Sequence, residues 1–505
     1  MKKGRLAAIN AFVGFFSQLI ILALGLIIPK IIINNYGSDT NGLTNTITQI
    51  FTYIALLEAG IGQAVQNALY PHFQKDDKKS ISELMSAGRR YYRKISIFYA
   101  LAVLIAAMVL PFILKTEVDF WTIFFYVFFE GLTSLVSFYF TGLWVIFLNT
   151  AGKTYFTNII TLLCRILQYG AKIVLALFGV NILFVQVGYF LVSLVSLLIY
   201  GLYMKNKYGW IDYKAADKSF RLPDRNAYIL TEVASAIFSS TDMVVLSIMV
   251  STSLSSVYSV YNMVFLAINA LINGVYTAIK YILGHAYSEN LERYKKLHDA
   301  FNSLFIGITT VCMCVCMWLT LPFVELYTRG VEDINYVYEW LPFWFCMVQM
   351  LSMSRYVAGN ISGIAGYAKP VSFSSLAEAI TNIVATVILV YFFGIYGAII
   401  GTVIALPIKV IYVNYLAERK IMKRSPAKTL WILTINYLVF GLTVIACQFY
   451  KPEISSYWQF VLWGAALFFA YLLVLFGLNA LVNKDVLLPI KMMLSKKKEQ
   501  GNGRN

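Results

Sequence analysis

Charged residues and long polar segments are scarce in this chain of 505 residues. Only 13% of the residues are charged and 59% are hydrophobic, which is far from the composition of soluble globular domains. The longest polar connections, 72–94 and 204–228, hold about two dozen residues each, and the sequence contains no GxxxxGK[ST] phosphate-binding loop. These absences exclude a nucleotide-binding domain, so any function must be carried out between apolar segments.

Cysteine and histidine are too few and too scattered to indicate a metal centre. All six cysteines lie in apolar stretches, and Cys312, Cys314 and Cys316 alternate within one of them. A helix would point these three thiols in different directions, as expected for small apolar residues rather than for metal ligands. We therefore expect no metal site and no organic cofactor.

What the chain has instead is a series of apolar segments that could each cross a bilayer, which takes roughly 20 residues of helix. The first is too long for the core of a signal peptide and is expected to remain as a span. We expect an all-α polytopic membrane protein with 14 transmembrane helices. The fourteen segments are 7–33, 41–70, 95–114, 119–149, 155–179, 181–203, 228–251, 254–284, 300–327, 335–362, 370–392, 394–416, 429–449 and 456–482.

Basic residues are sorted into alternate connections. With the N-terminus in the cytoplasm, 32 of the 41 Lys and Arg residues lie on the cytoplasmic side, about four lie outside and five lie within spans. This bias follows the positive-inside rule and places both termini in the cytoplasm. The net charge of +16 is then explained by contact with anionic membrane lipids, and nucleic acid is not expected as a partner.

The two halves of the chain match weakly at a nearly constant offset. Ala151-Gly152 corresponds to Ala365-Gly366 at 214 residues, and Phe178-Gly179 to Phe393-Gly394 at 215. Because each repeat holds six spans, the two repeats enter the membrane from the same side and are parallel. Two such lobes around a central cavity have the geometry of alternating access. The expected organisation is a lobe at 1–210, a lobe at 225–422, two additional helices at 428–482 and a basic tail at 483–505.

Several ionisable residues lie within the spans, where a charge at the bilayer centre costs about 2.5–3.5 kcal/mol. Arg165 and Glu58 fall near the middle of their spans, and Lys172 follows Arg165 by two helical turns on the same face. These residues either pair structurally or line a hydrated cleft in which the basic strip could hold an anion. Lys280 and Arg355 lie nearer the span ends, where long side chains can reach the interface. The other in-span charges are Glu130, Glu232, Asp242, Glu378 and Lys409.

Asp242 and Glu58 are the candidates for ion coupling or for charge pairing. Asp242, at the end of Ser239-Ser240-Thr241-Asp242, could bind a coupling proton or Na⁺, or could cap a basic partner. The second and eighth spans also carry many amide side chains, which are poorly suited to face lipid. We expect these two spans to line the cavity through Gln63, Gln66, Asn269 and Asn273.

Short sequences spread over the whole chain carry a family resemblance. They are Asn10 through Pro29, Asn35-Tyr36-Gly37, Leu57 through Ala64, Asn149 through Lys153, Thr241 through Ser247 and Val257 through Tyr261. In order and spacing they resemble the oligosaccharide flippases of bacterial polysaccharide export, the Wzx-type branch of the multidrug/oligosaccharidyl-lipid/polysaccharide superfamily.

The resemblance implies two six-helix lobes around a central cavity, plus two extra helices. It also implies that undecaprenyl-diphosphate-linked oligosaccharide repeat units cross the bacterial cytoplasmic membrane for the assembly of a capsule, O-antigen or teichoic-type polymer. A polysaccharide polymerase and a chain-length regulator are the implied partners. The cationic residues that could meet the diphosphate or an acidic sugar are Arg165, Lys172, Lys280 and Arg355. The related lipid II flippases are similar in placing an arginine in the first span. This chain departs from them, because residues 7–29 contain no charged residue.

Two other functions stay open. A multidrug/cation antiporter of the same superfamily would favour an acidic cavity, whereas the in-span charges here are five basic and five acidic. A membrane-bound sugar or acyl transferase would need a sizeable outside loop, and no outside connection exceeds about ten residues. We therefore expect a transporter rather than an enzyme.

Overall fold

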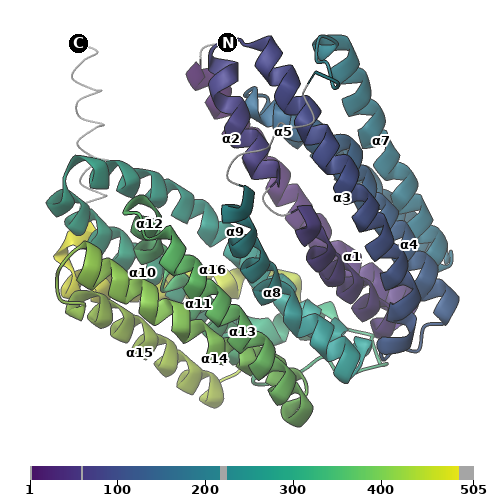
Figure 1. Cartoon of the computed structure of the whole chain (residues 1–505). Helices are drawn as coiled ribbons and strands as arrows, with labels where there is room; N and C mark the ends of the chain where they lie inside the picture. Colours follow the sequence, from purple (N-terminus) through teal and green to yellow (C-terminus); the bar gives the residue numbers. More distant parts are fainter. Residues whose placement is uncertain (1–2, 59–60, 216–224, 488–505) are drawn as a thin grey trace, which may run out of the picture. The chain divides into compact units, whose positions relative to one another are not determined.

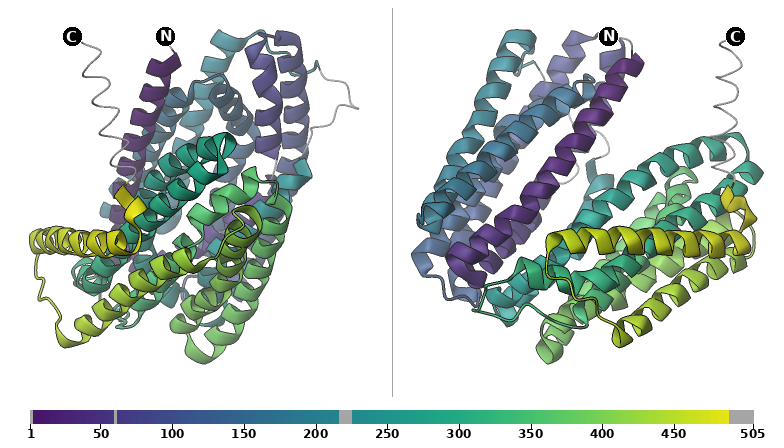
Figure 2. Two further views of the ribbon diagram at one scale, coloured as in Figure 1. Left: turned by 90° about the vertical axis from the view of Figure 1, so that its left-hand side faces the viewer. Right: turned by 180° about the vertical axis from the view of Figure 1, so that it is seen from behind.

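The structure is a computed structural model that describes residues 3–58, 61–215 and 225–487. Over these ranges the chain forms helices joined by turns, with no β-strand, as both views in Figure 2 show. The chain divides into two compact units, Met1–Ser259 and Val260–Asn505. The all-helical class predicted from the apolar segments is confirmed.

The first unit contains the helices up to the start of α9 (Figure 1). In chain order these elements are α1 (Lys3–Ile54), η1 (Ala55–Glu58), α2 (Ile61–Gln74), α3 (Lys78–Ile113), α4 (Phe120–Leu135), the π-helical η2 (Val136–Gly142), α5 (Leu143–Thr150), α6 (Thr154–Leu177), α7 (Ile182–Tyr208) and α8 (Arg225–Met249).

The second unit begins within α9 and extends to the end of the described chain. Its elements are α9 (Thr252–Glu289), α10 (Leu291–Tyr327), α11 (Leu341–Met353), α12 (Tyr356–Ile364), α13 (Ala368–Phe393), α14 (Ile395–Tyr415), the π-helical η3 (Leu416–Ile421), α15 (Ala427–Phe449), α16 (Tyr457–Val482) and η4 (Lys484–Leu487).

Eleven helices in the described part of the chain are long and apolar enough to cross a membrane. Three of the fourteen predicted spans are not counted separately among these eleven helices. The first two spans are joined within α1, which is kinked at the non-helical Gly37 (φ 84°), and the tenth is divided between α11 and α12. Within the seventh, the described apolar helix covers only Ala236–Met249. The chain is a multi-pass membrane protein.

Four turn glycines have positive φ angles at corresponding places in the two halves. Gly152 and Gly366 have φ values of 76° and 84°, and Gly179 and Gly394 have 67° and 54°. A side chain rarely adopts such left-handed angles, which glycine reaches at no steric cost. The helix-ending turns thus recur at the offsets found in the sequence.

Each unit has its own packing centre. In the first unit, Tyr92 and Tyr99 of α3 are almost fully buried. Tyr92 belongs to one cluster of apolar side chains and Tyr99 to another. In the second unit, α10 is buried along most of its length and packs against α11, α15 and α16. The predicted thirteenth and fourteenth spans therefore pack on the second unit through one shared helix.

Candidate functional site

The first unit contains a partly open cavity of about 770 Å³. Its lining comes from α1, η1, α2, α4, η2, α5, α6 and α7. A cavity of this size is in the range that holds small ligands. Its carboxylate and basic side chains are Glu58, Glu130, Arg165 and Lys172.

The basic side of the cavity is built by one face of α6. Arg165, Gln168 and Lys172 follow one another at spacings of three and four residues, which stacks them on one side of a helix. All three line the cavity, as does Tyr169. The placement of Arg165 and Lys172 on one face, predicted from their spacing, therefore brings both into the same cavity.

Tyr189 of α7 holds both cations. The Arg165 guanidinium donates a hydrogen bond to the Tyr189 hydroxyl at 2.9 Å, and the Lys172 ammonium lies 4.2 Å from the centre of the Tyr189 ring. A cation–π contact steadies an ammonium without using its hydrogen-bond donors. Among the residues that the structure describes, no acceptor lies within hydrogen-bonding distance of Lys172 Nζ and no carboxylate forms an ion pair with either cation.

The acidic side chains of the cavity have other partners. Glu130 accepts a hydrogen bond from Gln186 Nε2 at 2.6 Å, and Glu58 accepts one from the Tyr92 hydroxyl. Glu58 was predicted as a candidate, whereas Glu130 was recognised only as an in-span charge. The sequence feature that could have placed Glu130 in the cavity is a series of polar residues at helical spacing. These residues all line the cavity: Glu130, Thr133, Ser134, Ser137 and Thr141.

Part of the cavity lining comes from a π-helical segment. Val136, Ser137, Phe138, Thr141 and Gly142 of η2 all contribute. Single-turn π segments are rare and occur often at functional sites. No pattern in the sequence predicts this irregularity.

The polar residues of the second span have two roles. Asn41, Thr44, Asn45 and Thr48 line the cavity. Three residues of the same helix also bond to the α8–α9 region within the first unit, and we call these contacts the polar seam. In the seam, Asn41 donates to Ser256 at 2.7 Å, Asn45 donates to Ser259 at 3.1 Å, and the hydroxyls of Thr46 and Ser247 lie 2.5 Å apart.

Asp39 forms further hydrogen bonds next to the polar seam. Its carboxylate accepts hydrogen bonds from the Thr116 hydroxyl at 2.6 Å, from the Glu117 backbone N–H at 2.8 Å and from the Thr252 hydroxyl. It thereby connects α1, the α3–α4 connection and the α8–α9 turn.

The remaining predicted site residues lie outside this cavity lining. Asp242 is buried and accepts a hydrogen bond from the Tyr258 hydroxyl at 2.7 Å, and Gln66 donates to Tyr70 at 3.2 Å. The Gln63 side chain is outside the described residues. In the second unit, Lys280 is exposed on α9, Asn273 donates to Asn269, and Arg355 pairs with Glu378.

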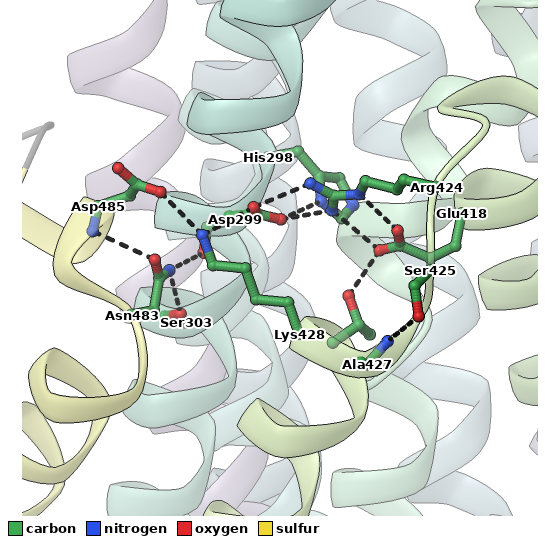
Figure 3. A network of polar contacts seen from close by, with 11 residues as sticks. His298, Asp299, Ser303, Glu418, Arg424, Ser425, Ala427, Lys428, Asn483 and Asp485 are labelled. Carbon is green, nitrogen blue, oxygen red and sulfur yellow. Dashed lines mark hydrogen bonds and ion pairs between the residues drawn. The ribbon is translucent and has the colours of Figure 1, made fainter.

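The second unit contains an ionic network around Arg424 (Figure 3). Arg424 donates to both oxygens of Asp299 on α10, at 2.9 and 2.5 Å, and to both oxygens of Glu418 on η3, at 2.6 and 3.1 Å. Lys428 joins Asp299 at 3.0 Å to Asp485 at 2.8 Å. Burial opposes the charge of Arg424, but the hydrogen bonds to Glu418 and Asp299 outweigh it and raise the pKa of this guanidinium.

The same network contains residues of metal-ligand type. Candidate ligand atoms of His298, Asp299 and Glu418 lie within 4.8 Å of one another. Arg424 already binds both carboxylates with paired hydrogen bonds, which is the strongest geometry for this kind of contact. We therefore interpret the network as a clamp that joins α10, η3, α15 and η4.

No family model matches the sequence, and no curated protein matches it. Solved structures do resemble it. A structure titled as a multidrug resistance MATE family transporter of the MOP superfamily in an inward-facing conformation has a TM-score of 0.63 and 14% identity over 86% of this chain and 98% of its own.

Two further structures extend this comparison. The lipid II flippase MurJ, in an inward closed conformation, has a TM-score of 0.65 and 12% identity over 91% of this chain and 98% of its own. A MATE structure in a bent conformation has a TM-score of 0.53 and 15% identity over 86% and 95%. At such low identities the likeness establishes the fold alone, and this chain has the fold of these MATE and MurJ structures.

Proposed function

We propose that the protein is an alternating-access flippase that moves an undecaprenyl-diphosphate-linked oligosaccharide across the bacterial cytoplasmic membrane for surface polysaccharide assembly. The observation that carries this proposal is the pair of cations, Arg165 and Lys172, held by Tyr189 in a cavity without an ion-pair partner among the described residues. One structure of similar fold is a lipid II flippase by title, which supports a lipid-linked cargo.

The chemistry of the cavity fits the headgroup of such a cargo. An ammonium with unused donors and a guanidinium can both bind phosphate or carboxylate oxygens through charge-assisted hydrogen bonds. Tyrosine rings and hydroxyl groups, which suit the faces and edges of sugars, complete the lining. They come from Tyr126, Ser134, Ser137, Tyr169, Ser193, Ser196 and Tyr200. We propose that the cavity receives the anionic part of the headgroup while the polyprenyl tail stays in lipid.

The cationic pair can be tested by removing its charges. Because a hydrogen bond to a charged group contributes about 1.5–3 kcal/mol, R165Q or K172Q is expected to slow flipping about tenfold to a hundredfold. The measurement uses vesicles containing the purified protein and a lipid-linked oligosaccharide, whose accessibility is read on each side of the membrane.

Lys153 offers a matched control. It stands just before the same helix and makes cation–π contacts with Tyr203 and Tyr208, but it does not line the cavity. K153Q should therefore flip the lipid at the wild-type rate. A double variant, R165Q with K172Q, that also flips at the wild-type rate would show that the cavity does not hold the cargo.

A multidrug/cation antiporter is the second candidate, because Glu58 and Glu130 line the same cavity and several similar structures are MATE transporters by title. In that case Glu130 would bind a cationic drug, a proton or Na⁺. We expect cells that express the protein to expel ethidium no faster than cells with an empty vector. Efflux above this background that disappears in E130Q would favour the antiporter.

The coupling ion and the partners are also proposals. Glu58 in the cavity and the buried Asp242 are the residues that we propose for coupling to a proton or Na⁺. Anionic lipids, a polysaccharide polymerase and a chain-length regulator are the proposed partners.

A further inference from the structure

Two asparagines of α1 belong both to the cavity and to the polar seam. Asn41 and Asn45 line the cavity of the first unit. Asn41 Nδ2 donates to the Ser256 hydroxyl at 2.7 Å and to the Ser259 hydroxyl at 3.4 Å. Asn45 Nδ2 donates to the same Ser259 hydroxyl at 3.1 Å. A ligand in the cavity therefore meets the side chains that hold α1 to the start of α9.

Both amides keep an unused acceptor. Each bonds to the seam through its N–H groups, and no residue in the described ranges donates to the side-chain carbonyl oxygen of Asn41 or Asn45. A hydroxyl group both donates and accepts hydrogen bonds. A sugar hydroxyl in the cavity can therefore donate to the amide oxygen, and a second one can accept from the amide N–H in place of a serine.

The polar seam holds a helix that runs from the first unit into the second. Ser256 and Ser259 lie near the start of α9, and the first unit ends at Ser259 while the helix continues. The predicted topology places the α8–α9 turn on the outer side of the membrane. Alternating access requires the two repeats to separate at this side in one of their states. The start of α9 can leave α1 only when the two amides release it.

We propose that Asn41 and Asn45 are sugar-contacting residues that couple occupation of the cavity to release of the polar seam. The hydroxyl groups of a bound sugar replace Ser256 and Ser259 as partners of the amides, which shifts the equilibrium toward an open seam. This role rests on the proposed function, because the ligand is the sugar of the lipid-linked cargo. It adds a means by which the cargo promotes its own exposure outside.

Closure of the seam can be measured as disulfide formation in the variant T46C/S247C. The hydroxyl groups of Thr46 and Ser247 lie 2.5 Å apart, so cysteines at these positions are close enough to join when the seam is closed. Neither residue lines the cavity, and the variant keeps both asparagines. The full chain in nanodiscs is treated with a mild oxidant, and the rate of cross-linking is followed by mass spectrometry.

The probe is undecaprenyl diphosphate that carries one N-acetylglucosamine. A saturating amount is expected to slow cross-linking about twofold to tenfold, the range that corresponds to the loss of one neutral hydrogen bond. Undecaprenyl diphosphate without a sugar is the control lipid. It should leave the rate unchanged, because it brings no sugar hydroxyl group to the amides.

Removal of the amides should abolish the response to the probe. In N41A/N45A the seam has lost these hydrogen bonds, so cross-linking should already be slow and the probe should not slow it further. Q49A is the matched control, because Gln49 is an amide on the same helix that lies outside the cavity lining. With Q49A, the probe should slow cross-linking as it does in the parent.

S259A tests the coupling from the other side. Ser259 does not line the cavity, so this variant weakens the seam and leaves the cavity side chains in place. Coupling between two sites is reciprocal, so a seam that the cargo opens must, when weakened, raise the affinity for the cargo. S259A is expected to bind the sugar-bearing probe about twofold to tenfold more tightly. A purely structural seam predicts unchanged binding.

Several results would overturn the proposed coupling. Saturable binding of the sugar-bearing probe with an unchanged rate of cross-linking would show that the cargo does not act on the seam, and it would leave the proposed function standing. Equal slowing by the sugarless lipid would overturn the sugar contact, and unchanged affinity in S259A would overturn the coupling. Absence of any saturable binding would contradict the proposed function and the coupling together.

Discussion

Replacing Gly42 with alanine is expected to abolish transport. A Cβ atom at this position would lie 1.7 Å from the Thr252 carbonyl oxygen and 2.9 Å from the Ser256 backbone nitrogen. Both neighbours are backbone atoms, so neither can rotate away as a side chain could. Helix α1 and the α8–α9 turn must separate, and the hydrogen bonds of the polar seam must break or lengthen.

The loss of transport by G42A is measured as flipping in vesicles, alongside the amount of folded protein. Separation of the seam is measured independently as labelling of S256C by a maleimide, because Ser256 is fully buried in the intact seam. G170A is the control, since a Cβ at Gly170 of α6 meets no atom within 4 Å. Wild-type flipping by G42A, with S256C still protected, would show that the seam tolerates the change.

Replacing Arg424 with methionine is expected to lower the free energy of unfolding by about 3–5 kcal/mol, the usual cost of removing one partner from a buried ion pair. The side chains of Asp299 and Glu418 are 5% and 1% exposed, so both carboxylates would remain buried without their shared cation. Methionine keeps much of the volume and removes the charge.

The stability of R424M is measured as thermal or chemical unfolding in detergent, against R293M as the matched control. Arg293 also pairs with a carboxylate, that of Glu289, but its side chain is 60% exposed. Exposed pairs of this kind contribute about 0.3–0.5 kcal/mol. If R424M and R293M unfold at the same temperature, the network is too well hydrated to act as a clamp.

The parts of the site that the sequence predicted are those that lie within one helix. Arg165 and Lys172 were found because depth in a span and a spacing of seven residues are both visible in one segment. The roles of Glu130 and Tyr189 depend on contacts between α4, α6 and α7, which no spacing rule provides. Their partners are distant in the sequence, as the Glu130–Gln186 hydrogen bond shows.

Backbone irregularities were the least predictable part of the fold. Hydropathy treats 335–362 as one span, and neither glycine nor proline stands at Ser354 or Arg355 to mark the break. Tertiary hydrogen bonds from Asn414 and Tyr276 support it. The turn glycines were easier, because a left-handed residue usually requires glycine. Their offsets of 214 and 215 residues were therefore visible in the sequence alone.

The clamp around Arg424 has a consequence for biosynthesis. Asp299 leaves the ribosome long before Arg424. Asp485 leaves it later still, roughly ten to forty seconds after Asp299 at about 5–20 residues per second. The carboxylate of Asp299 is thus without Arg424 and Lys428 while α11 to α14 are being inserted. Asn483, whose side chain donates to the Asp299 carbonyl at 2.8 Å, is synthesised just before Asp485. The second unit can therefore complete its ionic core only after residue 485 has been synthesised, and a chain interrupted before this point would expose buried charge to cellular quality control.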